Sequence, residues 1–404
     1  MTYDVAAVRA HFPALRAGAA HFDGPGGTQT PDVVAQAVAD ALTSPIANRG
    51  TVTAAELRAE GLVTSCRAAL ADLLGADPRG IVFGRSATAL TYDLSRALAR
   101  TWSPGDEVVV TRLDHDANVR PWVQAAQAAG AVLRWADFDP VTGELSVEDI
   151  TAVLSPRTRL VAVTAASNLI GTRPPVRQIA HRVHEHGALL WVDGVHASAH
   201  ASVDVGALGA DFWTCSPYKF LGPHCGVVAA DPALLERLHP DKLLPSTDEV
   251  PERFELGTLP YELMAGATAA VEFLAGLTSD STVIPARTPR ERLVASFDAL
   301  HGHEEALRLR LDAGIRELPG VRVFSNAGAR TPTTLFTLAG HDDQAVREAL
   351  AARNINAPAG SFYAIECSRH LGLGDDGAIR VGLAPYTDDD DVDRLLGALS
   401  EIAG

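Results

Sequence analysis

The stretch ALLWVDGVHASAHASVDVGALGADFWTCSPYKFLG (188–222) contains two short apolar runs, and each leads to a chemically active side chain. The first run ends at Asp193, and the second is followed by Lys219, 26 residues further along the chain. Runs that are apolar throughout are typical of strands covered on both faces of a sheet. This spacing matches one step from strand to strand, which would bring the acid and the amine to the same edge. Taken alone, the stretch also allows Lys219 to be an ordinary surface lysine.

Further apolar runs of the same kind lie on both sides of this stretch. We predict strands at residues 81–84, 107–111, 132–138, 160–167, 188–194, 211–216 and 226–230. Helical patterns lie between most of them, for example at residues 87–101 and 175–187. This alternation favours a layered α/β fold with a mainly parallel sheet. In such a fold, ligands bind beyond the carboxyl ends of the strands.

The pattern changes after residue 262, where we predict a smaller α+β domain. Helices are expected at 262–277, 342–354 and 389–404, and one long amphipathic helix or two helices at 290–318. Strand-like runs lie at 321–325, 333–340 and 378–385. Because 404 residues are too many for one simple core, two domains are expected. We predict an N-terminal segment (1–20) that packs near the small domain, a large domain (21–280) and a small C-terminal domain (281–404).

Composition excludes several classes of function. The formal net charge is −16, and no basic patch of the kind that binds nucleic acid is visible. The N-terminus has no signal-peptide pattern, and no apolar run reaches the roughly 18 residues of a membrane span. The four cysteines (Cys66, Cys215, Cys225 and Cys367) show no CxxC spacing, so neither a metal site nor a disulfide framework is predicted. A reducing cytoplasm fits this cysteine usage.

Three further segments could carry chemistry, and each also has a plain structural interpretation. The sequence GRSATALTYDLSRAL (84–98) indicates a strand, a tight turn and a helix N-terminus, which suits a phosphate group or is simply a capped helix. His115 follows the strand at 107–111 and could stack on a flat ring, or lie on the surface in a polar turn. Asn168 lies at the end of another predicted strand.

Together these motifs resemble a known family. IVFGRSATAL (81–90), GDEVVVTRLDHDANVRPW (105–122), SNLIGT (167–172), VDGVHASAH (192–200), DFWTCSPYKFLGP (211–223), RFELGT (253–258) and AIRVGLAPYTDDDDVDRLL (378–396) occur in the family's order and at similar spacing. The chain resembles fold-type I pyridoxal phosphate enzymes of the class V aminotransferase group, from about residue 20 to the C-terminus. It is most similar to the cysteine desulfurase and selenocysteine lyase branch. The resemblance implies a three-layer large domain with a smaller α+β domain.

The resemblance also implies roles for individual residues. Lys219 matches the lysine that forms a Schiff base with pyridoxal 5'-phosphate, and Asp193 matches the acid that pairs with the pyridine nitrogen. His115 matches the imidazole that stacks on the cofactor ring and can move protons. Other matches concern the phosphate (Ala87, Thr88, Ser216, and Thr258 from a neighbouring subunit), the phenolic oxygen and substrate (Asn168), and the substrate α-carboxylate (Arg380). The match at Thr258 implies a homodimer with shared active sites.

Three positions depart from the desulfurase pattern. His196 stands where glutamine is usual, and it can still bond the phenolic oxygen of the cofactor. Tyr218 replaces the histidine before the lysine, and its phenol can still donate to phosphate. Tyr363 stands at the position of the nucleophilic cysteine, where it is expected near the substrate. Cys367 lies four residues further on, and we interpret it as a buried structural thiol.

These departures bear on the reaction. A persulfide-forming desulfurase needs a thiolate, whereas β-elimination needs none when sulfur departs as a thiolate. We therefore expect a carbon–sulfur lyase acting on cysteine or an S-substituted cysteine. The alternatives are an aminotransferase, epimerase or decarboxylating deaminase on the same cofactor, or a non-catalytic dimeric relative. The loops at 21–30, 44–51 and 360–363 are expected to line the mouth of the site.

Overall fold

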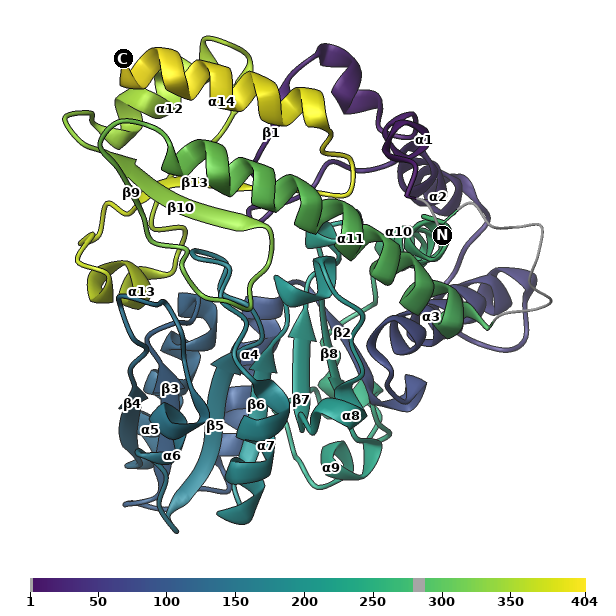
Figure 1. The fold of residues 1–404 in the computed structure, drawn as a ribbon. Helices are drawn as coiled ribbons and strands as arrows, with labels where there is room; N and C mark the ends of the chain where they lie inside the picture. Colours follow the sequence, from purple (N-terminus) through teal and green to yellow (C-terminus); the bar gives the residue numbers. More distant parts are fainter. Residues whose placement is uncertain (1–2, 279–287) are drawn as a thin grey trace.

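A seven-stranded sheet forms the base of the molecule in the computed structural model, which describes residues 3–278 and 288–404 (Figure 1). The strand order is β2-β8-β7-β6-β5-β3-β4; β8 runs antiparallel to both β2 and β7, and all the other neighbouring pairs are parallel. The strands are β2 (Ile81–Gly84), β3 (Glu107–Thr111), β4 (Val132–Ala136), β5 (Thr158–Thr164), β6 (Leu189–Asp193), β7 (Phe212–Cys215) and β8 (Gly226–Ala230). The predicted mainly parallel sheet is confirmed.

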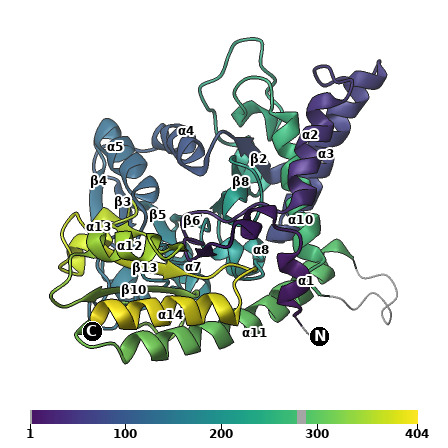
Figure 2. The same ribbon diagram turned by 90° about the horizontal axis from the view of Figure 1, so that it is seen from above.

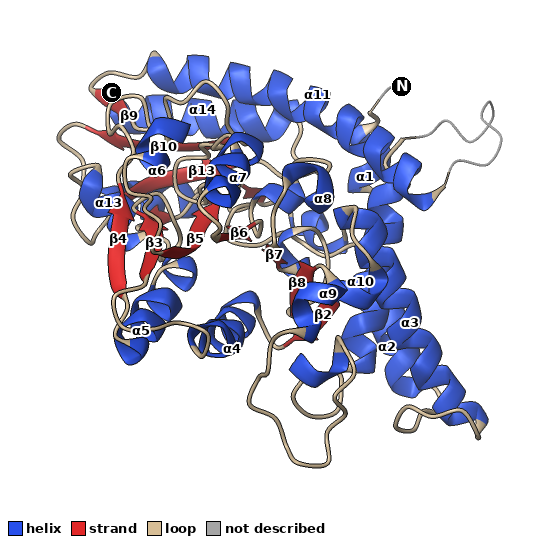
Figure 3. Ribbon diagram, turned by 90° about the horizontal axis from the view of Figure 1, so that it is seen from below, coloured by secondary structure: helices blue, strands red, loops and turns tan. Residues whose placement is uncertain are grey.

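Both faces of the central part of this sheet are buried, which explains why most of its strands are rich in apolar residues, whereas the edge strand β4 has exposed positions. Alternate residues of β5 and β6 point to opposite faces, so that Val161 and Leu190 join one core while Leu160 and Trp191 join the other. Helices α4 (Ala87–Ala99) and α5 (Arg120–Ala129) cover one face, as Figure 3 shows. The other face is covered by α6 (Val147–Thr151), α7 (Val176–Glu185) and α8 (Val205–Leu208). α9 (Pro232–Glu236) belongs to the first face, because its Leu234 and Leu235 are buried in the same core as the apolar residues of α4 and α5.

A second sheet follows in the C-terminal part, with the order β12-β13-β10-β9. Its strands are β9 (Val321–Val323), β10 (Thr333–Leu338), β12 (Ala359–Gly360) and β13 (Ala378–Gly382). Its helices are α11 (Pro289–Arg316), α12 (Asp343–Ala351), α13 (Ile365–His370) and α14 (Asp389–Ala403), and Figure 2 shows α11 and α14 side by side. The segment predicted as one helix or two is therefore the single helix α11.

The N-terminal segment contacts the C-terminal part. β1 (Ala20–His21) pairs in parallel with β11 (Ile355–Asn356), and α1 (Val5–Arg9) carries Arg9, which forms ion pairs with Asp388 and Asp391. The boundary predicted at residues 280 and 281 lies outside the described residues, and the domain limits stay a prediction.

Two long helices were missed by the sequence analysis. α2 (Asp32–Thr43) and α3 (Ala54–Leu74) pack against α10 (Tyr261–Ala275). A signal for α3 was present, because Thr53 and Glu56 form a capping box at its N-terminus. No helix in the described part of the chain has the length and apolarity that crossing a membrane requires.

Candidate active site

Two adjoining cavities lie beyond the carboxyl ends of the parallel strands. The inner cavity is lined by all the predicted cofactor-binding residues except Thr258: Ala87, Thr88, His115, Asn168, Asp193, His196, Ser216, Tyr218 and Lys219. The outer cavity, of about 470 Å³, shares several of these residues and Pro25 with the inner cavity, and it adds Asp23, Gly26, Asp116, Arg120, Phe362, Tyr363 and Arg380. The loops predicted at 21–30 and 360–363 therefore line the outer cavity. The loop at 44–51 lines a different one, which contains Asn48 and Arg49.

Lys219 lies just beyond β7, in a single 3₁₀ turn (Pro217–Lys219), with its amine between the two cavities. Its Nζ donates hydrogen bonds to the carbonyl oxygens of Pro25 and Gly26, the latter at 2.8 Å. Burial and the charge of Arg380 together lower the pKa of this amine to about 7, against the opposing effects of Asp23 and Asp193. Lys219 is therefore neutral in a large fraction of molecules at neutral pH, and a neutral amine is the nucleophilic form.

Asp193 is the last residue of β6 and is buried. Its Oδ1 accepts a hydrogen bond of 2.9 Å from the backbone N–H of Val195. Burial raises the pKa of this carboxyl to about 6, although the Val195 bond and the charge of Lys219 oppose the shift. A cationic partner would stabilise the ionised form of this buried carboxyl, and a protonated ring nitrogen would be such a partner.

His115 follows β3 and lines both cavities. The backbone N–H of Ala117 donates to its Nδ1 at 3.0 Å, which leaves Nε2 as the protonated nitrogen of the neutral ring. Burial lowers the pKa of His115 to about 4, and the charges of Lys219 and Arg380 act in the same direction. The imidazole is therefore neutral, and its ring stacks on that of Tyr363 with centroids 5.7 Å apart.

The N-terminus of α4 opens toward the inner cavity. Ser86 caps this helix by accepting a hydrogen bond from the N–H of Ala89, and Ala87 and Thr88 form its first turn. Gly226 of β8 lies against the turn, so closely that a Cβ at that position would be 2.1 Å from the carbonyl carbon of Ser86. The turn therefore depends on glycine, and its free N–H groups suit a phosphate.

Arg380 of β13 is buried and held from three sides. Its Nη2 forms an ion pair of 2.5 Å with Asp23, and its Nη1 donates to the carbonyl oxygen of Asn168 at 2.9 Å. The Phe362 ring lies 3.6 Å from the guanidinium carbon, within the range of a cation–π contact. Arg380 Nε and Asn168 Oδ1 are buried without a hydrogen-bond partner among the described residues. A substrate that offers an acceptor and a donor would satisfy both.

The loop above these residues presents an aromatic side chain and no thiol. Phe362 and Tyr363 both have left-handed backbones, with φ of 50° and 59°, a conformation that costs free energy in non-glycine residues. Asn168 Nδ2 donates to the carbonyl oxygen of Phe362 at 3.0 Å, and the backbone N–H of Asp116 donates to the carbonyl oxygen of Tyr363 at 2.7 Å. Tyr363 is 77% exposed, whereas Cys367 in α13 is fully buried, and burial raises the pKa of its thiol.

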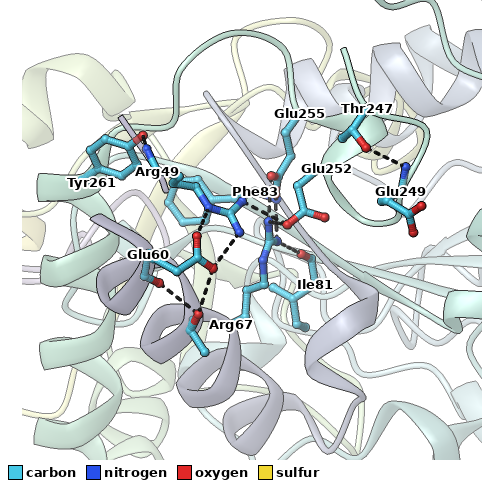
Figure 4. Close-up of polar contacts among 11 residues, drawn as sticks. Arg49, Glu60, Arg67, Ile81, Phe83, Thr247, Glu249, Glu252, Glu255 and Tyr261 are labelled. Atoms are coloured by element: carbon cyan, nitrogen blue, oxygen red, sulfur yellow. Dashed lines mark hydrogen bonds and ion pairs between the residues drawn. The ribbon is translucent and has the colours of Figure 1, made fainter. Parts of the chain in front are cut away.

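Thr258 lies outside both cavities. It is exposed, and it lines two other cavities of the same chain. Its segment is anchored by an ion-pair network that the sequence analysis missed, shown in Figure 4. Glu255 pairs with Arg67 at 2.8 Å and accepts the N–H of Phe83, while Arg49 bridges Glu60 and Glu252.

Asp23, Phe362 and the carbonyls of Pro25 and Gly26 are the other site features that sequence reasoning did not single out. The only signals were the glycine-rich run GPGG (24–27) and the predicted role of both loops at the mouth of the site.

Comparisons with known proteins agree with this geometry. The model of the aminotransferase class-V family matches residues 20–395. An uncharacterised protein of Mycobacterium tuberculosis is 34% identical over all of both chains, and a cysteine desulfurase of Dickeya dadantii is 31% identical over 99% of this chain and 97% of its own. The crystal structure of the Escherichia coli cysteine desulfurase CsdA superposes with a TM-score of 0.87 at 26% identity, covering 99% of this chain and 98% of that one. The chain belongs to the class-V aminotransferase family.

Proposed function

We propose that this enzyme is a carbon–sulfur lyase that acts on cysteine or an S-substituted cysteine by β-elimination, without a cysteine nucleophile of its own. Enzymes of its family use pyridoxal 5'-phosphate, and its relatives include proteins named as cysteine desulfurases. One observation carries the proposal beyond the family: Tyr363 is exposed at the outer cavity, while Cys367 is fully buried. None of the four cysteines, all of which lie in described segments, lines either cavity.

The residues of the inner cavity fit pyridoxal phosphate. The first turn of α4, against which Gly226 packs, has free N–H groups that could bind the phosphate. Thr88 and Ser216 add hydroxyl groups to the same part of the cavity. The buried Asp193 carboxyl suits the ring nitrogen, and the Lys219 amine, with a pKa of about 7, suits the aldehyde carbon.

Each residue then has a defined task. When bound, pyridoxal phosphate supplies an electron sink that weakens the bonds at the substrate Cα. Asp193 would hold a proton on the ring nitrogen, and neutral His115 would pack on the ring face. Arg380 would bind the substrate α-carboxylate through its free Nε edge. The Lys219 amine would take the Cα proton of the substrate.

The proposed elimination needs no thiolate from the protein. The Cα–H and Cβ–S bonds break, and sulfur leaves with the bonding electrons as sulfide or a thiolate. With one water molecule, the carbon skeleton becomes pyruvate and the nitrogen becomes ammonium. No oxidant or reductant is required.

Other reactions on the same cofactor remain the alternatives, namely transamination, epimerisation and decarboxylating deamination. Which one occurs depends on which Cα bond stands perpendicular to the cofactor ring. A non-catalytic relative is disfavoured because Lys219, Asp193 and Arg380 all lie around the two cavities, and a scaffold has no use for this set.

We also propose a cytoplasmic homodimer in which Thr258 of each chain reaches the cofactor phosphate of the other. Thr258 is exposed and outside its own inner cavity, which supports a role in a neighbouring site. The free state of all four cysteines fits a reducing compartment.

Two measurements test the reaction. Purified enzyme should be yellow and lose this absorbance with borohydride, whereas Lys219→Ala should not form the covalent adduct. Incubation with cysteine and S-methylcysteine should yield pyruvate together with sulfide or methanethiol in equal amounts. Conversion of the cofactor to its pyridoxamine form without pyruvate would instead support transamination. Colourless protein that cannot be reconstituted would exclude all of these reactions.

A further inference from the structure

His196 lies in the wall of the inner cavity, and its ring is fixed by the C-terminal part of the chain. Its Nε2 is 2.9 Å from the hydroxyl oxygen of Thr331 and 3.0 Å from that of Thr333. The ring of His200 packs edge-on against it, with centroids 4.9 Å apart, and His200 is bonded to the buried carboxylate of Glu304. The Nδ1 of His196 has no hydrogen-bond partner among the described residues.

The protons of the two threonines decide which nitrogen of His196 carries hydrogen. Each hydroxyl has one proton to donate. Thr331 can donate to Thr333 Oγ1 or to the carbonyl oxygen of Gly171, both at 3.3 Å. The shortest contact open to the proton of Thr333 is Nε2 of His196, at 3.0 Å. In this arrangement Nε2 accepts, and the proton of the neutral ring resides on Nδ1.

The surroundings keep the ring neutral. Burial holds the pKa of His196 well below its usual value, and the charges of His200, Lys219 and Arg380 lower it further. A neutral imidazole carries one proton. If Nε2 of His196 accepts a hydrogen bond, this proton resides on Nδ1, the nitrogen without a protein partner.

We propose that Thr331 and Thr333 are positioning residues that lock His196 as the Nδ1–H tautomer, so that Nδ1 donates a hydrogen bond to the phenolic oxygen of the bound cofactor. The inference rests on the proposed placement of pyridoxal phosphate in the inner cavity. It explains how histidine can serve where glutamine is usual, since both then present an N–H. Thr331 lies just before β10 and Thr333 is the first residue of β10, so this part of the chain sets the hydrogen bonding of the cofactor ring.

The first test needs no cofactor. In ¹⁵N-histidine-labelled apoenzyme, with His196→Gln used for assignment, the His196 signals should show a protonated Nδ1 and an unprotonated Nε2. The double variant T331V/T333V should lose this preference, and T331S/T333S should keep it. A wild-type ring protonated at Nε2 would overturn the proposal whether or not the protein binds pyridoxal phosphate.

The second test uses the holoenzyme and reads absorbance. Loss of a donor to the negatively charged ring oxygen should raise the pH midpoint of the cofactor's visible absorbance change by about one pH unit in T331V/T333V. Thr334→Val is the matched control, because Thr334 is equally buried but bonds Asp312 instead. An equal midpoint in T331V/T333V and in the control would contradict the proposal. Failure of wild-type enzyme to bind the cofactor would count against the proposed function instead.

Discussion

Asp23 and Arg380, which are 357 residues apart in the chain, form an ion pair of 2.5 Å. The Asp23 carboxylate lies at one edge of the guanidinium, and the Phe362 ring lies over its face. The pair joins the N-terminal side of the glycine-rich loop at 24–27 to the C-terminal sheet, and the amine of Lys219 donates hydrogen bonds to carbonyl oxygens of the same loop. Arg380 Nε is the donor that is left without a partner. The ion pair with Asp23 therefore orients Arg380, which we expect to bind the substrate carboxylate.

Arg380→Lys should raise KM for the amino-acid substrate and lower kcat/KM by about 10- to 100-fold. Lysine keeps the positive charge. A single ammonium group cannot, however, pair with Asp23, donate to Asn168 and still offer a free donor in the fixed planar geometry of a guanidinium. Loss of a charged hydrogen bond costs about 1.5–3 kcal/mol, which corresponds to this range. Steady-state kinetics with cysteine measure the effect, and Arg353→Lys on the surface serves as the control. Unchanged KM in Arg380→Lys would place carboxylate binding elsewhere.

Reconstitution of apoenzyme with pyridoxal phosphate should become faster as the pH rises from 6 to 8, with a midpoint near 7. The neutral amine of Lys219 attacks the aldehyde, and burial lowers its pKa to about 7, so the reactive fraction grows as pH passes through that value. Stopped-flow absorbance gives the rate at each pH, and Lys219→Ala gives the blank. A rate that keeps rising through pH 9 would mean that the amine has an ordinary lysine pKa.

Cys367→Ala should leave turnover within about twofold of wild type. The thiol is fully buried in α13, and burial raises its pKa, so it is neither accessible nor ionised. We expect a loss of stability of about 1 kcal/mol, the usual size for a single core substitution. Pyruvate release and urea unfolding should be compared in the same preparation. Loss of activity as severe as in Lys219→Ala would identify Cys367 as the nucleophile.

Thr258→Val should weaken cofactor binding about tenfold, because one hydroxyl bond to the phosphate is lost. The cofactor should dissociate more readily from the variant at protein concentrations at which the chain is dimeric. At concentrations low enough for the dimer to dissociate, wild type and variant should bind the cofactor equally, since Thr258 is outside its own inner cavity. Sedimentation velocity fixes the two concentration ranges. A defect that persists in the monomer would argue against a shared site.

Glu255→Ala should reduce the free energy of unfolding by about 3 kcal/mol. Arg67 and Glu255 are 8% and 3% exposed, and removing one partner of a buried ion pair leaves an uncompensated charge. The Phe83 N–H also loses its acceptor. Asp393→Ala, which removes an exposed pair with Arg310, should cost no more than about 1 kcal/mol. Urea unfolding of both variants separates the two cases, and equal losses would show that the network in Figure 4 adds little.

Local patterns were enough to predict all seven strands of the large sheet, because the run of mostly apolar residues that marks each strand is only a few residues long. The same locality explains the success with α4, α7 and α14. The failure with α3 follows from its weak amphipathic contrast. α2 is as amphipathic as α4, so its helical pattern was present in the sequence and was overlooked.

The sequence by itself therefore determined the α/β architecture, the positions of Asp193 and Lys219 at neighbouring strand ends, and the absence of a cysteine at position 363. Only the tertiary structure decided that Asp23 would hold Arg380 and that Thr331 and Thr333 would bond His196. The physical reason is distance along the chain. Strand ends follow from short-range periodicity, whereas these contacts join segments more than 130 residues apart.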